Sequence, residues 1–180
     1  MEAPFPKSTT RLRALIERVV RLSTAEDWSE GLNPSQRAVL RYLARANRHS
    51  RAPSLVAEYL GATRGTVSQT LHALERKGLV VAVPSQTDRR SIRHDLTPEG
   101  RALADRTDAI KTALAGLDPL QAAAMEDALG AALGAMLAVR GGRAFGICRD
   151  CRHHRSGAGG AHCALLNMSL TPEEMGQHCA

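Results

Sequence analysis

The stretch VAEYLGATRGTVSQTLHALERKGLV, residues 56–80, decides the fold of this chain. Gly61 follows a short apolar segment, and glycine is the residue that most often ends a helix. Thr63 is a suitable N-cap for a second helix over residues 64–77, which Gly78 would end. Two helices joined by so short a turn form a helix-turn-helix, whose second helix can enter the major groove of DNA.

The residues before this turn predict three helices. Apolar residues at helical spacing predict the first over residues 8–22. The second begins at Asn33 and Pro34, a preferred N-cap and a preferred first helical residue, and runs to about Asn47. The third spans residues 53–60 and is the first half of the helix-turn-helix. The side chains expected to face the core are Val39, Leu40, Tyr42, Leu43, Val67, Leu71 and Leu74.

The residues after it predict a β-hairpin followed by a long helix. Residues 79–83 are rich in β-branched side chains, and residues 91–96 alternate apolar and polar ones. A polar turn, residues 84–90, separates the two strands. Thr97 is a suitable N-cap for the long helix. The order of elements is therefore that of a winged helix-turn-helix, in which the hairpin is the wing.

A last long helix is expected over residues 118–139. It is rich in alanine, and Gly130 and Gly134 lie four residues apart. Small residues let helices approach closely, so this helix suits packing against another helix of the chain or of a partner subunit. Gly141 and Gly142 end it and form a hinge before the C-terminal segment.

Three stretches resemble the multiple-antibiotic-resistance regulator (MarR) family. They are LNPSQRAVLRYLAR at 32–45, the stretch 56–80 and DRRSIRHDLTPEGRAL at 88–103. The last fits the family's wing signature, which here reads Asp88, Arg90, Leu96, Thr97, Pro98, Gly100 and Leu103. The resemblance covers about residues 30–105. It implies a two-fold dimer that binds a pseudo-palindromic DNA operator and regulates transcription, most often as a repressor.

The resemblance also implies how the chain is divided. The fold class expected is mainly α with a small β-hairpin wing (α+β): a winged helix-turn-helix flanked by dimerisation helices, plus a cysteine-rich metal-binding segment. We expect an N-terminal dimerisation helix in residues 1–32, the DNA-binding domain in 33–97, C-terminal dimerisation helices in 98–140 and the cysteine-rich segment in 141–180. The family binds small organic anions between its two modules, but no residue here names such an effector.

The predicted recognition helix carries side chains that can read base edges. Its N-terminal half presents Arg64, Thr66, Ser68 and Gln69. Arginine can pair with guanine and glutamine with adenine through two hydrogen bonds each. Gly65 would let the backbone approach the DNA. The alternative is that these residues are merely exposed and polar.

The predicted wing carries three arginines, Arg89, Arg90 and Arg93. The resemblance places such side chains near the minor groove, and narrow minor grooves attract arginine. Asp88 is expected to pair with an arginine and shape the wing. The histidines of this part of the chain, His49, His72 and His94, are expected at the surface or facing phosphate.

The composition indicates a globular protein with a polyanionic partner. The chain has 180 residues, of which 43% are hydrophobic, and a net charge of +6. Such a charge favours nucleic acid, although a merely basic surface gives the same value. The N-terminus has no signal-peptide pattern, and the longest apolar stretch, 131–139, is too short to span a bilayer. We therefore expect no membrane partner and a cytoplasmic protein.

All four cysteines lie near the C-terminus, in the pattern C-x₂-C-x₁₁-C-x₁₅-C: Cys148, Cys151, Cys163 and Cys179. Structural disulfides are rare in the cytosol, so the cluster indicates metal binding or redox chemistry. Three arginines, Arg149, Arg152 and Arg155, are expected to lower the pKa of nearby thiols. His162 and His178 each precede a cysteine and could replace it as a ligand, but are expected to be exposed neighbours.

Two cofactors suit four thiolates, and the sequence does not choose between them. Structural zinc takes four cysteines in a tetrahedron, and C-x₂-C is its usual half-site. An iron–sulfur cluster also takes four cysteines, with more varied spacing. Zinc sites commonly use two paired knuckles, whereas Cys163 and Cys179 stand alone. This favours a cluster over zinc, with a metal-free thiol switch or an inert tail as further alternatives.

The leading hypothesis is a dimeric DNA-binding regulator whose operator binding responds to an iron–sulfur cluster that senses redox state, oxygen or iron. The first alternative is the same regulator with a zinc site and a small-molecule effector. A second is a zinc-stabilised protein-interaction module without DNA binding, which a salt-dependent gel shift would distinguish. An enzyme with a catalytic C-x-x-C would need a βαβ context, which the residues around Cys148 do not provide, so no enzymatic activity is expected.

Overall fold

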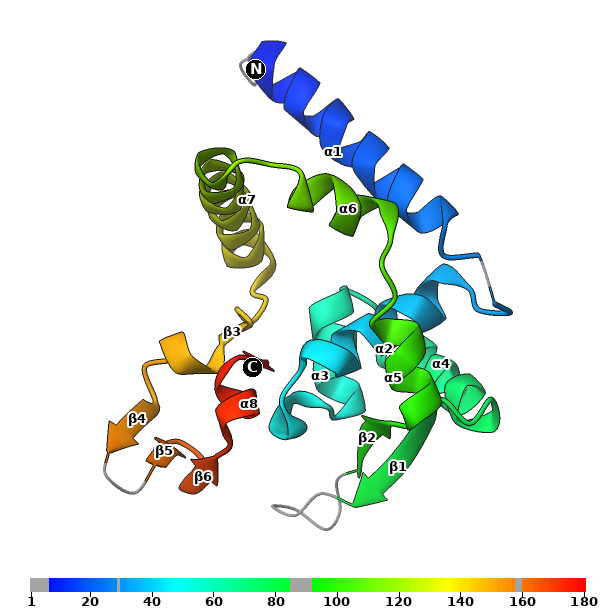
Figure 1. Cartoon of the computed structure of the whole chain (residues 1–180), viewed down its shortest axis with the longest axis vertical. Helices are drawn as coiled ribbons and strands as arrows, with labels where there is room; N and C mark the ends of the chain where they lie inside the picture. Colours follow the sequence, from blue (N-terminus) through cyan, green and yellow to red (C-terminus); the bar gives the residue numbers. More distant parts are fainter. Residues whose placement is uncertain (1–6, 29, 85–91, 158–159) are drawn as a thin grey trace.

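The computed structural model describes residues 7–28, 30–84, 92–157 and 160–180. Figure 1 shows helices α1, α6 and α7 on one side and the winged helix with the C-terminal segment on the other. The chain begins at the far end of α1, whereas its C-terminus lies in the middle of the molecule, beside α3.

The predicted winged helix is confirmed. It consists of α2 (Pro34–Arg45), a 3₁₀ turn η1 (Arg48–Ser50), α3 (Pro53–Leu60), α4 (Arg64–Arg76), β1 (Val80–Pro84) and β2 (Ile92–Leu96). The two strands pair antiparallel, with Val80 opposite Leu96. The turn of the wing, residues 85–91, lies outside the described residues.

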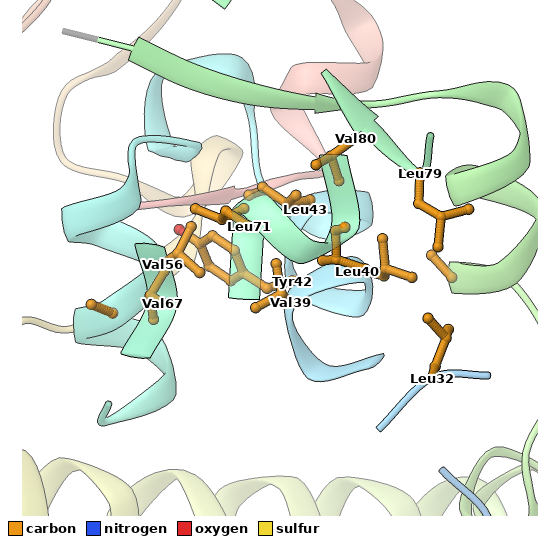
Figure 2. Close-up of a cluster of buried hydrophobic side chains, with 14 residues drawn as sticks. Leu32, Val39, Leu40, Tyr42, Leu43, Val56, Val67, Leu71, Leu79 and Val80 are labelled. Carbon is orange, nitrogen blue, oxygen red and sulfur yellow. The ribbon is translucent and has the colours of Figure 1, made fainter. Parts of the chain in front are cut away.

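One apolar core lies between α2, α4 and the hairpin (Figure 2). All seven side chains predicted to face the core are buried there. The full set of buried residues is Leu32, Val39, Leu40, Tyr42, Leu43, Ala46, Val56, Ala57, Val67, Leu71, Leu74, Leu79, Val80 and Ala104. Burying a large aliphatic side chain contributes roughly 1.5–3 kcal/mol, so this core supplies most of the stability of the DNA-binding fold.

Side-chain caps place the helices where the sequence predicts them. Asn33 and Gln36 form a reciprocal capping box at the start of α2, and the Thr63 hydroxyl accepts a hydrogen bond from the Thr66 amide at the start of α4. Gly61 ends α3 in the left-handed conformation, with φ of 61°. The turn between α3 and α4 is therefore determined by local chemistry.

The contacts of Thr97 and Gly100 explain why these two residues belong to the wing signature. The Thr97 hydroxyl donates to the carbonyl of Gly78 at 2.8 Å and accepts from the amide of Gly100 at 3.1 Å. It thus caps α5 (Pro98–Ala104) and ties this helix to the end of α4. Gly100 lies against the backbone of Leu79, and a Cβ at this position would overlap the Leu79 carbonyl oxygen.

The long helix predicted after Thr97 is wrong, because the structure divides it into α5 and α6 (Ala109–Ala115). Asp108 explains the break. One carboxylate oxygen accepts from the Lys111 amide at 2.8 Å and caps α6, and the other lies 2.8 Å from the Arg41 guanidinium on α2. The first piece, α5, packs on α2 and adds Ala104 to the winged-helix core.

Ion pairs connect α2 to the segments on either side of it. The buried Asp27, just after α1 (Lys7–Ala25), lies 3.0 Å from the Arg41 guanidinium and 3.6 Å from that of Arg37. Arg37 also pairs with Glu30 at 3.2 Å. Because Arg41 bridges Asp27 and Asp108, one network joins the end of α1 and the start of α6 to the DNA-binding fold.

Helix α7 (Pro119–Arg140) has 22 residues, none of which is buried, and all but Leu137 are exposed. By length and composition it is long and apolar enough to cross a membrane, which the uninterrupted apolar stretch 131–139 alone is not. Glu126 and Asp127 lie within it. Together α1 and α7 expose a large apolar surface: Leu12, Leu15, Ile16, Val19, Val20, Leu22, Leu120, Met125, Leu129, Leu133, Met136 and Val139.

The C-terminal segment folds into small sheets and a short helix. Its elements are β3 (Gly146–Ile147), a 3₁₀ turn η2 (Cys148–Asp150), β4 (His154–Gly157), β5 (Gly160–Cys163), β6 (Met168–Leu170), α8 (Pro172–Met175) and β7 (His178–Cys179). Strands β4, β5 and β6 form one antiparallel sheet, and β3 pairs with β7. Thr171 caps α8 in a reciprocal capping box with Glu174.

Candidate nucleic-acid interface and cysteine centre

The start of α4 presents the four predicted base-reading residues to solvent. Arg64, Thr66, Ser68 and Gln69 are all exposed, whereas Val67 faces the core. This separation follows from the helical period, because successive residues of an α-helix are rotated by about 100° and Val67 can face the core while Thr66 and Ser68 do not. The Thr66 hydroxyl lies 2.8 Å from that of Thr63 and so belongs to the cap. Arg64 and Gln69 are the longest polar side chains of the set.

The wing residues divide into two groups. Asp88, Arg89 and Arg90 lie outside the described residues, so their predicted roles stay predictions. Arg93 lies on β2 and is only partly exposed, with its guanidinium 3.1 Å from the Asp95 carboxylate. That ion pair holds Arg93 along the strand.

The sequence reasoning missed Arg143, which follows α7. Its amide donates to the Glu58 carboxylate on α3 at 3.1 Å, and its guanidinium lies 3.7 Å from the same group. Arg143 and Arg64 line one surface hollow beside the turn between α3 and α4. A second cation therefore lies next to the recognition helix. No sequence motif marks it, since only the folded linker brings it there.

The surface position expected for His94 is wrong. This side chain is 6% exposed, and its Nδ1 is buried without a hydrogen-bond partner. Burial lowers the pKa of His94 below its ordinary value, and the nearby Glu75 carboxylate opposes this effect. Its backbone amide donates to the carbonyl of Arg51 at 3.1 Å, so β2 is tied to the loop before α3.

A hollow lies between α2 and α6, where the DNA-binding fold meets the helices that follow it. Three cations, Arg45, Arg106 and Lys111, line it together with the apolar Ile110 and Leu114. Arg41 also lines it but pairs with Asp27 and Asp108, and Arg106 pairs with Glu30; Asp105 and Asp108 are part of the lining as well. The hollow combines cations with apolar walls, as a site for a small organic anion would.

Strand pairing brings the four cysteines together. The Cys148-x-x-Cys151 turn is closed by a bond from the Cys151 amide to the Cys148 carbonyl at 3.1 Å. Cys179 on β7 pairs with Gly146, two residues before Cys148. Cys163 on β5 pairs with His154, three residues after Cys151. Each cysteine that stands alone in the sequence is thus returned to the C-x-x-C turn by its own strand.

Three of the four cysteines form part of one small core. Cys148 and Cys163 are buried together with Leu170, and Cys179, Met168 and Met175 pack against them. All four thiols are free. Burial raises the pKa of Cys148 to about 11, and the other three cysteines add to the rise. The four groups are therefore close enough to interact electrostatically.

The expected lowering of the thiol pKa by arginines is wrong for Cys148. The three arginines of the segment are exposed. Arg155 donates to the carbonyls of Arg152 and His154 at 2.7 and 2.8 Å, and Arg152 donates to His153 at 3.1 Å. Ionising thiols in such a core needs a cation inside it, which is what a metal ion or cluster supplies.

Two histidines present unpartnered nitrogens within the segment. His154 Nε2 and His178 Nδ1 are buried and make no hydrogen bond in the described structure. His154 had no assigned role in the sequence reasoning, and only its pairing with Cys163 reveals its position. Across the described ranges, no three His, Cys, Asp or Glu side chains are arranged to hold a single metal ion.

Residues 30–91 match the model of the MarR family. Among solved structures, the MepR–DNA complex of Staphylococcus aureus is 22% identical, with a TM-score of 0.55 over 74% of this chain and 99% of MepR. Streptococcus pneumoniae FabT in complex with DNA is 23% identical, with a TM-score of 0.57 over 74% and 97% of the two chains. No curated protein matches the sequence.

A third structure agrees with these two. It is Sco3205, a MarR family transcriptional regulator from Streptomyces coelicolor in complex with DNA, which is 24% identical with a TM-score of 0.56. It is matched over 90% of its own length and 73% of this chain. Residues 30–91 are therefore a MarR-type winged helix, and the chain has the fold of MarR family regulators over about three quarters of its length.

Proposed function

We propose that this protein is a dimeric, sequence-specific DNA-binding regulator of transcription, acting as a repressor. The observation that carries the proposal is the exposed N-terminal half of α4, with Arg64 and Gln69 directed to solvent on a MarR-type winged helix. Three structures of similar fold were solved with DNA bound. MarR family members are transcriptional regulators rather than enzymes, and the Cys148–Cys151 turn lies between short strands, not in a βαβ unit.

The dimer accounts for the apolar surface of α1 and α7. Large exposed apolar surfaces mark interfaces in proteins that are not embedded in lipid. Gly130 and Gly134 have open space around them, which lets a second helix approach closely. We therefore assign α7 to contact with a second subunit in the cytoplasm rather than to a membrane.

DNA selection from a random duplex library tests the proposal. The account predicts a pseudo-palindromic consensus with half-sites about one helical turn apart. It also predicts that the logarithm of the association constant falls linearly with the logarithm of salt concentration. A protein that enriches no sequence and binds duplex DNA no better than single strands would be an interaction module instead.

We further propose that the four cysteines hold an iron–sulfur cluster that sets DNA affinity in response to redox state, oxygen or iron. Four free thiols in and beside one core, with the Cys148 pKa raised by burial and by the other three cysteines, support a site that binds a cation. The donor set fits, since such clusters are held by four cysteine thiolates. Cys163 and Cys179 come from separate strands rather than a second C-x-x-C knuckle, which favours a cluster over zinc.

Analysis of protein purified without oxygen tests this assignment. A cluster predicts a brown protein with iron and acid-labile sulfide in stoichiometric amounts, both lost in Cys148→Ser. A colourless protein with one zinc per chain, also lost in Cys148→Ser, would replace the cluster by zinc. If the wild-type protein contains neither iron nor zinc, a thiol switch remains as the explanation. Titration of the reduced thiols before and after mild oxidation would then detect it.

The hollow between α2 and α6 supports a second input, a small organic anion. Arg45 and Lys111 supply cations beside the apolar Ile110 and Leu114, whereas Arg106 is paired with Glu30. Benzoate is a suitable probe because it combines a carboxylate with an apolar ring. Isothermal titration is expected to show binding that Lys111→Ala weakens. Equal heats for the protein and for buffer alone would remove this input.

A further inference from the structure

The end of the chain lies along the loop that follows α2. Ala46 and His178 form a parallel β-bridge, and the Asn47 amide donates to the His178 carbonyl at 2.9 Å. Two residues later the Ala180 amide donates to the Ser50 hydroxyl at 3.1 Å. Figure 1 shows α8 and the C-terminus facing α3 across this loop. The seam, defined as residues 46–51 with 178–180, is therefore formed by backbone pairing.

Side chains on both sides close the seam. The Arg48 guanidinium lies 3.1 Å from the Glu174 carboxylate, which is itself buried, and donates to the Ser169 carbonyl at 3.2 Å. Behind it, Tyr59 stacks near His178 with ring centroids 6.0 Å apart. The two partners of Arg48 lie on α8 and β6, so the seam attaches both elements of the cysteine segment to the loop.

The loop side of the seam is buried. Ala46, Asn47 and Ser50 are 0–1% exposed. The Asn47 side chain accepts from the amides of His49 and Ser50 at 3.0 and 3.1 Å and so fixes the shape of the loop. Buried backbone groups need partners, and here the tail supplies one for Asn47. Departure of the tail would leave this amide and the Ser50 hydroxyl without those partners.

The loop 46–51 also binds β2 of the wing, through Arg51 at the end of the loop. Arg51 donates to the Ala46 carbonyl at 3.0 Å and to the Asp95 carboxylate on β2 at 2.9 Å. The Arg51 carbonyl accepts from the His94 amide. Asp95 in turn holds Arg93. Residues 46–51 thus connect β7, the strand that contains Cys179, with β2, the second strand of the wing.

The cysteine core holds the tail in place. The Cys148 amide donates to the Gln177 carbonyl at 3.0 Å, and Cys179 pairs with Gly146. A change that releases Cys179 from the other cysteines therefore also releases His178 from the loop.

We propose that the cysteine centre controls DNA binding within its own subunit, through the seam and the loop 46–51, by holding β2 of the wing in place. The proposal rests on the proposed function. The seated tail is the DNA-competent state, and loss of the cysteine centre unseats it. Coupling requires that the signal have different affinities for the two states, and seating of the tail supplies that difference.

Hydrogen exchange on the full chain tests the structural half of the proposal. Cys163→Ser opens the cysteine core regardless of the cofactor, and circular dichroism checks that the helices remain. The expected result is faster exchange at Asn47, Ala180 and β2 than in wild type, with α4 unchanged. Faster exchange confined to residues 141–177 would overturn the proposal. If Cys163→Ser does not fold, chelator-treated wild type takes its place.

A double-mutant cycle on DNA affinity tests the functional half. Cys163→Ser alone is expected to weaken binding to the selected DNA by about tenfold, within the usual range of allosteric coupling. In the Arg48→Ala background the seam is already broken but the cysteines remain. There, Cys163→Ser is expected to weaken DNA binding by less than about twofold. Arg13→Ala is the matched control, because its exposed side chain pairs with Glu17 on α1 and not with the seam.

The outcomes separate this proposal from the proposed function. If Cys163→Ser weakens DNA binding equally in wild type and in Arg48→Ala, the coupling follows another route. That result would overturn the proposal that the seam carries it. Wild type that binds no DNA would end the proposed function, and the exchange experiment would still decide whether the tail orders the loop and β2.

Discussion

The backbone amide of Asn47 donates a 2.9 Å hydrogen bond to the carbonyl oxygen of His178. Asn47 follows α2 of the winged helix, and His178 precedes the last cysteine. The cysteine segment therefore contacts the DNA-binding fold directly. The covalent link between this segment and the rest of the chain runs through Gly141 and Gly142 after α7. The contact gives the segment a shorter route to the wing.

Base reading by α4 predicts different effects for two substitutions. Gln69→Ala removes a side chain that reads one base edge, so preference at one operator position should relax by about 1–3 kcal/mol. Arg90→Ala should weaken binding to all sequences and reduce the salt slope, because a phosphate or groove contact carries little sequence information. Titrations over an operator mutant set measure both. Unchanged affinity and preference in both variants would remove α4 and the wing from the interface.

Gly100→Ala should destabilise the winged helix. The new Cβ would overlap the Leu79 carbonyl oxygen, so β1 or α5 must shift. Overpacking of this kind typically costs about 1–3 kcal/mol. Gly65→Ala is the control, since its Cβ would meet only the Thr63 hydroxyl at 3.9 Å. Urea denaturation at one fixed protein concentration compares them. Equal midpoints would contradict the close approach of α5 and β1.

Asp27→Ala should destabilise the junction between α1 and α2. It leaves Arg37 in a buried site without one of its carboxylates, and breaking a buried pair costs roughly 3–5 kcal/mol. Glu17→Ala removes an exposed partner of Arg13 on α1 and should cost less than about 0.5 kcal/mol. Thermal unfolding distinguishes the two. Similar losses would mean that the network around Arg41 contributes little.

The buried His94 predicts a pH dependence of stability. Its pKa is lowered in the folded state, so below about pH 6.5 the unfolded chain binds more protons than the folded one. Stability should then fall as pH falls from about 7 toward 5. The charge of His72 lowers the His94 pKa further, whereas the carboxylates of Glu75 and Asp95 oppose the lowering. His94→Gln should flatten this part of the profile. Parallel profiles for wild type and variant would exclude His94 as a contributor.

The apolar face of α7 predicts that one charge can weaken the dimer. Leu133→Asp places a carboxylate where Leu133, 56% exposed in the single chain, would be covered by a second subunit. Sedimentation equilibrium should show dissociation at concentrations where wild type is dimeric. Gln121→Asp, at the polar start of the same helix, is the control. A dimer unaffected by Leu133→Asp must use another surface.

Local chemistry explains which elements could be predicted. Asn33, Thr63 and Gly61 determine helix ends through hydrogen bonds within a few residues, so the helix-turn-helix was predicted correctly. Asp108 has the same kind of cap, but its second bond to Arg41 is a tertiary contact. The break between α5 and α6 therefore could not be placed from the pattern of apolar residues alone.

The candidate site divides in the same way. The exposed positions of Arg64 and Gln69 follow from helical period. The convergence of Cys163 and Cys179 on the C-x-x-C turn depends on two strand pairings whose registers no spacing rule predicts. The burial of His94 and the position of Arg143 beside Arg64 depend on contacts between distant segments. The residues next to His94 and Arg143 in the sequence do not indicate this burial or this position.

The most direct test of the central claim is the affinity of the protein for its selected DNA with the cysteine centre intact and with it removed. Fluorescence anisotropy at one fixed salt concentration, under anaerobic conditions, measures both states. The account predicts binding at least about fivefold weaker after removal. Equal affinity in the two states, with loss of the cofactor verified by metal analysis, would contradict it and leave the cysteines a structural role only.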